Sequence, residues 1–184
     1  MNSFVDASEL DITPNEINVI ETYTGGESLW INNFLRERNL DQLNSAQKDL
    51  MKKYAVTLNN IIKKSPPSKR KTTVYRGAEP MDGKWKNLSY GDELLFTQKG
   101  IISTTFDINV ALDFIENGSN CCLLVLCLPK GTKGLYISSM SAFNELGEDE
   151  LLLPHGSKFL IIKRVVELHN DRSIITYYAD LIQQ

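Results

Sequence analysis

Apolar residues in the first third of the chain recur at three- and four-residue intervals, which is the spacing of amphipathic helices. The pattern predicts three helices, over residues 15–22, 29–35 and 45–63. Thr13-Pro14 precedes the first as an N-cap and first-turn pair, and Gly25-Gly26 separates it from the second. The buried face of the third helix is expected to carry Leu50, Tyr54, Leu58 and either Ile61 or Ile62.

From residue 72 onward the pattern changes to short runs rich in β-branched residues. One short helix, 109–116, follows Asp107, which is expected to be its N-cap. Two longer apolar runs, 158–168 and 173–182, are separated by polar residues and predict a terminal β-hairpin. The other predicted strands cover residues 72–76, 93–97, 100–105, 121–128, 134–137 and, leading out of an acidic turn, 148–153.

The order of these elements predicts an α+β fold, with helices first and a mainly antiparallel sheet after them. We expect a single domain, 1–184, with a helical part at 1–64 and a β-rich part at 72–184. The segment between the two parts, 65–71, contains two prolines and a basic run, and it is interpreted as a solvated linker.

Composition excludes classes of protein without indicating a function. The chain has 184 residues, with 20 Lys+Arg, 23 Asp+Glu, a net charge of −3 and a pI near 5.5, so bulk charge gives no support for a nucleic-acid partner. No apolar run approaches the roughly 20 residues of a membrane span, and the N-terminus lacks the basic and apolar regions of a secretory signal. We therefore expect no nucleic-acid or membrane partner.

The cysteines Cys121, Cys122 and Cys127 are crowded into one apolar segment. An odd number in such a segment makes a poor disulfide framework, and cysteine behaves as a small hydrophobe in a buried strand. A reducing, cytoplasmic place of action follows as the expectation. His155 and His169 are distant in sequence from this segment, so no metal site is expected.

Two short stretches of the β-rich part place polar groups at strand ends. Tyr75-Arg76-Gly77 ends a strand with a guanidinium, whose planar fork of donors suits phosphate oxygens, followed by a glycine that lets the backbone be approached closely. Ser103-Thr104-Thr105 ends another strand with three consecutive hydroxyls, which can hold backbone and ligand polar groups. Taken alone, the first stretch is more typical of a surface arginine before a turn, and the second can be explained by Thr105 or Asp107 as a helix N-cap.

A third stretch, Glu148-Asp149-Glu150, leads directly into an apolar run. In an extended strand Glu148 and Glu150 point to one face, separated by about 6.5–7 Å, and Asp149 points to the other. Two carboxylates that face one cavity suit a reaction that stabilises a ribosyl cation and deprotonates an incoming nucleophile. The alternative interpretation is an exposed acidic turn.

Together, in this order, the three stretches resemble the mono-ADP-ribosyltransferases of the arginine–serine–glutamate class, found in bacterial toxins and phage enzymes. The likeness extends upstream to Tyr23-Thr24 and Ile31–Arg36, and downstream through the strand and turn after Glu150. One departure is Thr105, which stands where the family has a second serine. The resemblance implies an ADP-ribosyltransferase-like fold, in which the helices pack on a two-sheet β core.

The resemblance also implies a function: transfer of ADP-ribose from the co-substrate NAD to a protein side chain, with release of nicotinamide. Arg76 and Gly77 would bind the NAD phosphates, Ser103 and Thr104 the nicotinamide-ribose end, and Glu150 would stabilise the oxocarbenium-like transition state. Glu148, where a glutamine would suggest asparagine as acceptor, implies that arginine is modified. Phe143, in the preceding loop, is the candidate for contact with the protein substrate.

Two alternatives stay open on the sequence. An NAD glycohydrolase would use water in place of the acceptor, and a non-catalytic binding domain would keep the fold without turnover. Phe106 or Phe114 could pack near nicotinamide, but both are expected to be core residues. The catalytic unit is expected to be a monomer of phage, viral or injected origin that acts in the cytosol of a target cell.

Overall fold

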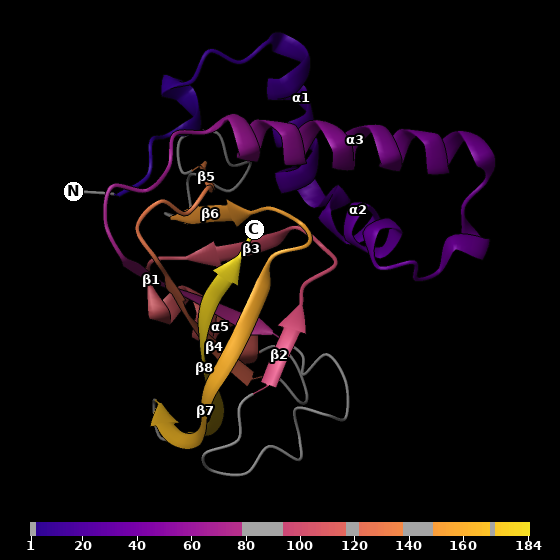
Figure 1. Ribbon diagram of the computed structural model, residues 1–184. Coiled ribbons are helices and arrows are strands. Elements are labelled where there is room, and N and C mark those ends of the chain that lie inside the picture. Colours follow the sequence, from indigo (N-terminus) through magenta and orange to yellow (C-terminus); the bar gives the residue numbers. More distant parts are fainter. Residues whose placement is uncertain (1–2, 79–93, 117–121, 138–148, 170–171) are drawn as a thin grey trace.

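The computed structural model of the protein describes residues 3–78, 94–116, 122–137, 149–169 and 172–184 (Figure 1). Helices α1 to α3 lie together beside the end of the sheet that contains β3, β6 and β5, whereas α5 packs against β1, β3 and β4 (Figure 1). The helices are η1 (Ala7–Glu9), α1 (Pro14–Thr22), η2 (Tyr23–Glu27), α2 (Ser28–Leu35), η3 (Leu40–Gln42), α3 (Ser45–Lys64) and α5 (Ile108–Glu116).

Each predicted helix is confirmed, and its start has a local cause. Thr13 and Glu16 form a capping box at α1, in which each side chain accepts a hydrogen bond from the other residue's backbone N–H. Asn44 and Gln47 do the same at α3. The carboxylate of Asp107 accepts from the backbone N–H of Asn109 at 2.9 Å, as the predicted cap of α5 should.

The glycine break between the first two helices is a π-helical turn, η2, rather than a gap. Its backbone stays helical until Gly26, which adopts φ 121°, a left-handed value that favours glycine. The turn redirects the chain from α1 into α2 and leaves Tyr23 buried at the bend.

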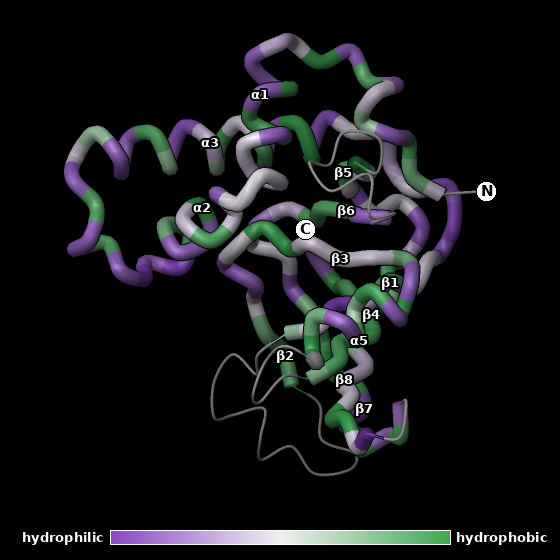
Figure 2. Tube along the Cα trace, turned by 180° about the vertical axis from the view of Figure 1, so that it is seen from behind, coloured by the Kyte–Doolittle hydropathy of each residue, from purple (hydrophilic) through white to green (hydrophobic). Residues whose placement is uncertain are grey.

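The buried face of α3 differs from the predicted face by about one residue. Leu50 is 41% exposed, whereas Met51 and Ala55 are buried together with the expected Leu58, Ile61 and Ile62. Met51, Ala55, Leu58 and Ile62 follow the three- and four-residue spacing of a helix stripe, and this stripe packs against α1, α2 and the β3–β6–β5 end of the sheet. Figure 2 shows hydrophobic and hydrophilic residues alternating along α3.

In the described residues the β part is a mixed sheet of eight strands, mostly antiparallel, in the order β2-β7-β8-β4-β1-β3-β6-β5. The α+β class and the terminal hairpin, β7 with β8, are therefore confirmed. The strands are β1 (Thr72–Ala78), β2 (Leu94–Thr97), β3 (Ile102–Thr105), β4 (Cys122–Leu128), β5 (Leu135–Tyr136), β6 (Glu150–Leu153), β7 (Lys158–His169) and β8 (Arg172–Gln183).

The two sheets expected from the resemblance are joined by hydrogen bonds into one continuous sheet, and the connection between its two halves is short. Only Tyr75 of β1 and Thr105 of β3 are register partners across the junction, whereas β1 pairs with β4 along its whole length. Five strands therefore form one half and three strands, β3, β6 and β5, form the other. The junction brings three strand ends together.

The linker 65–71 is less solvated than its composition predicts. Ser65 and Ser68 are buried, and Ser68 exchanges backbone hydrogen bonds with the turn at Gly131 and Thr132. These contacts satisfy backbone groups that a free linker would leave to water, so the segment is anchored.

The interpretation of the cysteines as buried core residues fits Cys122 better than Cys127. Cys122 is fully buried and Cys127 half-buried, both as free thiols, while Cys121 lies outside the described residues. Within the described part of the chain no cluster of three His, Cys, Asp or Glu side chains could hold a metal ion. The helices seen there are all too short or too polar to cross a membrane.

Candidate active site

A cavity of about 500 Å³ lies at the junction of the two halves of the sheet. It is enclosed by β1, β3, β6, α5 and the η2 turn. All the predicted site residues that the structure describes line it: Arg76, Gly77, Ser103, Thr104 and Glu150. Thr105, the departure from the family pattern, also lines it. Glu148 and Phe143 lie outside the described residues.

The strand register explains how three separate motifs reach one cavity. Thr105, the last residue of β3, is the partner of Tyr75 in β1 on one side and of Glu150 in β6 on the other. Arg76 is the neighbour of Tyr75, so the arginine, hydroxyl and glutamate motifs all meet at this one row of the sheet.

Arg76 is held at the back of the cavity by a backbone contact. Its guanidinium donates to the carbonyl oxygen of Ser103. Burial lowers the pKa of Arg76, and the nearby Tyr23 and Glu150 act in the opposite direction. A partly desolvated cation interacts strongly with an anion that enters the cavity, because water screens it less.

Ser103 belongs to a polar chain that crosses from the sheet to the helices. The hydroxyls of Ser103 and Tyr23 lie 3.2 Å apart, and the side-chain amide of Asn32 donates to the Tyr23 hydroxyl at 3.1 Å. Tyr23 and Asn32 are only 1% and 7% exposed. Burial, followed by the charge of Glu150, raises the pKa of Tyr23, so it stays a neutral phenol at physiological pH.

The two threonine hydroxyls of the second motif already have partners in the fold. Thr104 donates to the carbonyl of Leu151 at 2.8 Å, which fastens β3 to β6. The hydroxyl of Thr105 accepts from the backbone N–H of Asp107 at 3.1 Å and so helps to start α5. Of the three hydroxyls, Ser103 is therefore the one held by side chains of the cavity wall.

Close packing of α5 explains the glycine at position 77, in addition to the predicted approach of a ligand to the strand backbone. A Cβ at this position would lie 2.4 Å from the carbonyl oxygen of Ala111 and 3.0 Å from the Cβ of Phe114. The absence of a side chain thus lets α5 lie directly against β1. The helix in turn brings Val110, Ala111 and Phe114 to the cavity.

The expectation that both candidate phenylalanines are core residues is wrong for Phe114. Its side chain is 62% exposed and lines the cavity, although its Cβ lies close to Gly77 of β1. Phe106 is partly buried and packs against Phe4 and Tyr136, outside this cavity.

Sequence reasoning does not assign cavity roles to Tyr23, Asn32 or Phe114. The first two stand in the N-terminal segment that carries the family likeness, and that likeness is the one signal that points to them. Tyr23 contacts the sheet at Ser103, which is 80 residues away in the chain, so no local sequence pattern predicts the contact.

Comparisons with known proteins agree with this geometry. The family model described as ADP-ribosyltransferase exoenzyme matches residues 3–183. A search of curated proteins finds no match to this chain.

Among solved structures, Plx2a, an ADP-ribosyltransferase toxin from Paenibacillus larvae, is 22% identical, with 94% of this chain and 88% of that chain covered and a TM-score of 0.75. The ADP-ribosyltransferase Vis, from Vibrio splendidus, was solved in complex with agmatine; it is 21% identical over 94% of this chain and 76% of its own, with a TM-score of 0.71. An ADP-ribosyltransferase from Clostridium botulinum is 20% identical over 95% of this chain and 89% of its own, with a TM-score of 0.69.

Proposed function

This chain belongs to the ADP-ribosyltransferase exoenzyme family and transfers ADP-ribose from NAD, and we propose that its acceptor is an arginine side chain of a protein. The observation that supports cleavage of NAD in this cavity is the convergence of Arg76, Ser103 and Glu150 on it. A cation for phosphate, an anchored hydroxyl and a carboxylate are the three groups that cleavage of the nicotinamide–ribose bond requires.

The cavity is suited to NAD in size and in polar groups. Its volume lies within the range of roughly 300–1,000 Å³ of small-molecule sites. Asn32, which lines it, donates through its side-chain amide to the Tyr23 hydroxyl, so the wall of the cavity is polar beside Ser103. Arg76 binds the phosphates, and Gly77 keeps the strand backbone open beside them.

Glu150 acts on the reacting ribose. Its carboxylate, positioned with help from Ser103, binds the ribose 2′-hydroxyl and stabilises the positive charge that develops on the ring as the glycosidic bond breaks and nicotinamide leaves with the electron pair. An acceptor nitrogen then forms the new bond to the same ribose carbon. Glu148 holds the acceptor guanidinium and takes its proton as that bond forms, because a free arginine is almost always protonated in water.

Two observations support arginine as the acceptor. The sequence has a glutamate at Glu148, two residues before Glu150. The structurally similar enzyme Vis was solved with agmatine, a small molecule that carries the guanidinium group of arginine. The second supports the proposal through similarity of fold.

The test is turnover of isotope-labelled NAD with agmatine and with arginine peptides, and mass spectrometry of the products. We expect ADP-ribosyl agmatine and free nicotinamide. Glu148→Gln should lower transfer about a hundredfold or more while it spares part of the NAD hydrolysis, because water has a lone pair and can attack before it loses a proton, whereas a protonated guanidinium must lose one as the bond forms. Glu37→Gln, at an exposed ion pair with Lys99, is the matched control. Nicotinamide release without a modified acceptor in any reaction would identify a glycohydrolase instead.

The chain is further proposed to act as a single catalytic domain, as a monomer, in the cytosol of a target cell. Three cysteines, an odd number, lie within seven residues of one apolar segment, which is a poor disulfide framework and supports a reducing compartment. Light scattering of the purified chain measures its mass, and a dimer would contradict the monomer.

A further inference from the structure

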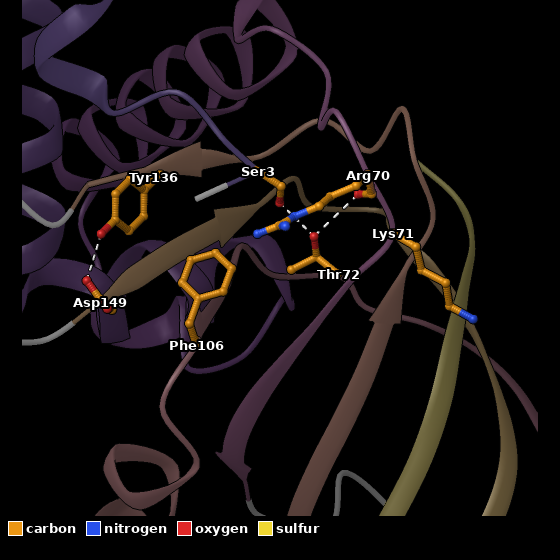
Figure 3. Close-up of a pocket in the computed structure, with 7 residues that line it drawn as sticks. All are labelled: Ser3, Arg70, Lys71, Thr72, Phe106, Tyr136 and Asp149. Atoms are coloured by element: carbon orange, nitrogen blue, oxygen red, sulfur yellow. Dashed lines mark hydrogen bonds between the residues drawn. The ribbon is translucent and has the colours of Figure 1, made fainter. Parts of the chain in front are cut away.

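A second cavity, of about 490 Å³, lies where β1 and β6 begin and β3 ends. It is separate from the NAD cavity and shares no lining residue with it. Figure 3 shows the residues that line it: Ser3, Arg70, Lys71, Thr72, Phe106, Tyr136 and Asp149.

The register of β3 and β6 links the two cavities. Thr105 and Glu150 are paired and line the NAD cavity, and the next residues outward, Phe106 and Asp149, line the second cavity. Successive side chains of an extended chain point to opposite faces, about 3.3 Å apart along the strand. The two cavities therefore open on opposite faces of β3 and β6, at the same strand ends, and Asp149 of the second cavity is the chain neighbour of the glutamate that acts on ribose.

The floor of the second cavity is aromatic and carries an oriented carboxylate. The rings of Phe106 and Tyr136 pack edge to face, with centroids 5.7 Å apart. The Tyr136 hydroxyl donates to one carboxylate oxygen of Asp149 at 2.6 Å. The carboxylate is thereby fixed, and it has capacity to accept further hydrogen bonds, such as one from a peptide N–H.

The cation of this cavity is Arg70. In Figure 3 its side chain extends across the opening toward Phe106, whereas the side chain of Lys71 points away. The hydroxyls of Ser3 and Thr72 beneath it lie 2.6 Å apart and bond to one another. A guanidinium above an aromatic floor is suited to bind a carboxylate, and an acidic peptide offers a carboxylate for Arg70 and N–H groups for Asp149.

We propose that the second cavity docks an acidic segment of the protein substrate close to the arginine that is modified. This inference rests on the proposed function, and it adds a selectivity: arginines with a nearby glutamate or aspartate are preferred. The docked segment lies on the opposite face of the sheet from Glu150, and the few residues between it and the arginine pass around the strand ends that the two cavities share.

The experiment uses blocked peptides that contain one arginine and, a few residues away on either side, glutamate, glutamine or lysine. The readout is the ratio of kcat/KM between peptides for a given enzyme, which cancels any change in its basal activity. The wild type should prefer the glutamate peptide over the glutamine peptide by about threefold to tenfold. Arg70→Glu should reverse the order and favour the lysine peptide. Lys69→Glu, the same charge change at an exposed neighbour that does not line the cavity, should keep the wild-type ratio.

Titration of the same peptides without NAD should give the same order of affinities. Equal ratios for the glutamate and glutamine peptides, or an unchanged order in Arg70→Glu, overturn the docking proposal. Binding of AMP in this cavity without discrimination between the peptides also overturns it and identifies a nucleotide site. If the wild type modifies neither agmatine nor any peptide, the proposed arginine transfer fails, and the titration still tests the cavity.

Discussion

Hydrogen-bonded polar side chains occur both in the wall of the NAD cavity, where they are buried, and on the outer surface of the helical part, where they lie close to water. At the cavity, Tyr23 and Asn32 are buried and bonded to one another. At the start of α1, Glu16 bonds to Thr13 and pairs at 3.5 Å with Lys64, whose side chain is 76% exposed. Buried polar groups are costly to leave unpaired, whereas exposed ones exchange partners with water. The same substitution should therefore have unequal effects in the two regions.

The largest difference is expected for glutamate replaced by glutamine. Glu150→Gln keeps the shape of the side chain and removes its charge, so NAD hydrolysis and transfer should both fall about a thousandfold. Glu37→Gln makes the same change at a side chain that is 74% exposed and should leave both rates unchanged. Nicotinamide release and labelled product measure the two rates, and full activity of Glu150→Gln would remove Glu150 from the proposed mechanism.

The next difference concerns glycine replaced by alanine. At Gly77 the new methyl group would collide with the backbone oxygen of Ala111 at 2.4 Å, so α5 must move. We expect a loss of about 2–3 kcal/mol in the free energy of unfolding and a higher KM for NAD, since Phe114 moves with the helix. At Gly25 a Cβ has nothing within 4 Å and the backbone is not left-handed.

Gly25→Ala is therefore the control, and its stability should stay equal or rise by at most about 1 kcal/mol. Urea unfolding and NAD titration measure both variants. Equal stabilities of the two alanine variants would show that α5 adjusts freely, and the cavity wall would then be less rigid than the contact at Gly77 indicates.

A smaller difference is expected for tyrosine replaced by phenylalanine. Tyr23→Phe removes the hydroxyl between Asn32 and Ser103, leaving a buried amide without its acceptor. This should cost about 1–2 kcal/mol of stability and lower NAD turnover about tenfold through a misplaced Ser103. Tyr54→Phe, in α3 away from the cavity, should change neither by a comparable amount. Turnover that falls equally in both variants would argue against a positioning role for Tyr23.

The sequence predicts best what local contacts determine. Thr13 and Asp107 cap helices because their side chains reach backbone groups within three residues, and the terminal hairpin pairs adjacent segments. The predicted bounds of these elements agree with the structure to within a few residues. The predicted face of α3 is wrong at Leu50 because its neighbours on α1 and the sheet, rather than its own spacing, select the buried stripe.

The assembly of the site depends on contacts between distant segments. The single register pair between β1 and β3 and the pairing of β3 with β6 bring Arg76 and Glu150 to one cavity, and neither follows from local periodicity. Motif order indicates the cavity residues only through the family resemblance. The prediction for Phe114 is wrong because an aromatic on an apolar helix is usually buried, and only the position of α5 above Gly77 shows that it is exposed.

The smallest effect is expected at the exposed end of α1, where pH separates charge from shape. Hydrogen bonds from Thr13, together with Lys64, lower the pKa of Glu16 in the folded chain. The carboxylate therefore stabilises the fold at neutral pH, and this contribution disappears as the pH falls through the lowered pKa. Glu16→Gln keeps a side chain that can complete the capping box and loses only the charge, so at neutral pH it should cost at most about 0.5 kcal/mol. Urea midpoints of wild type and variant should converge in acid. A gap that persists there would mean that the hydrogen bonds, rather than the charge, carry the contribution of Glu16.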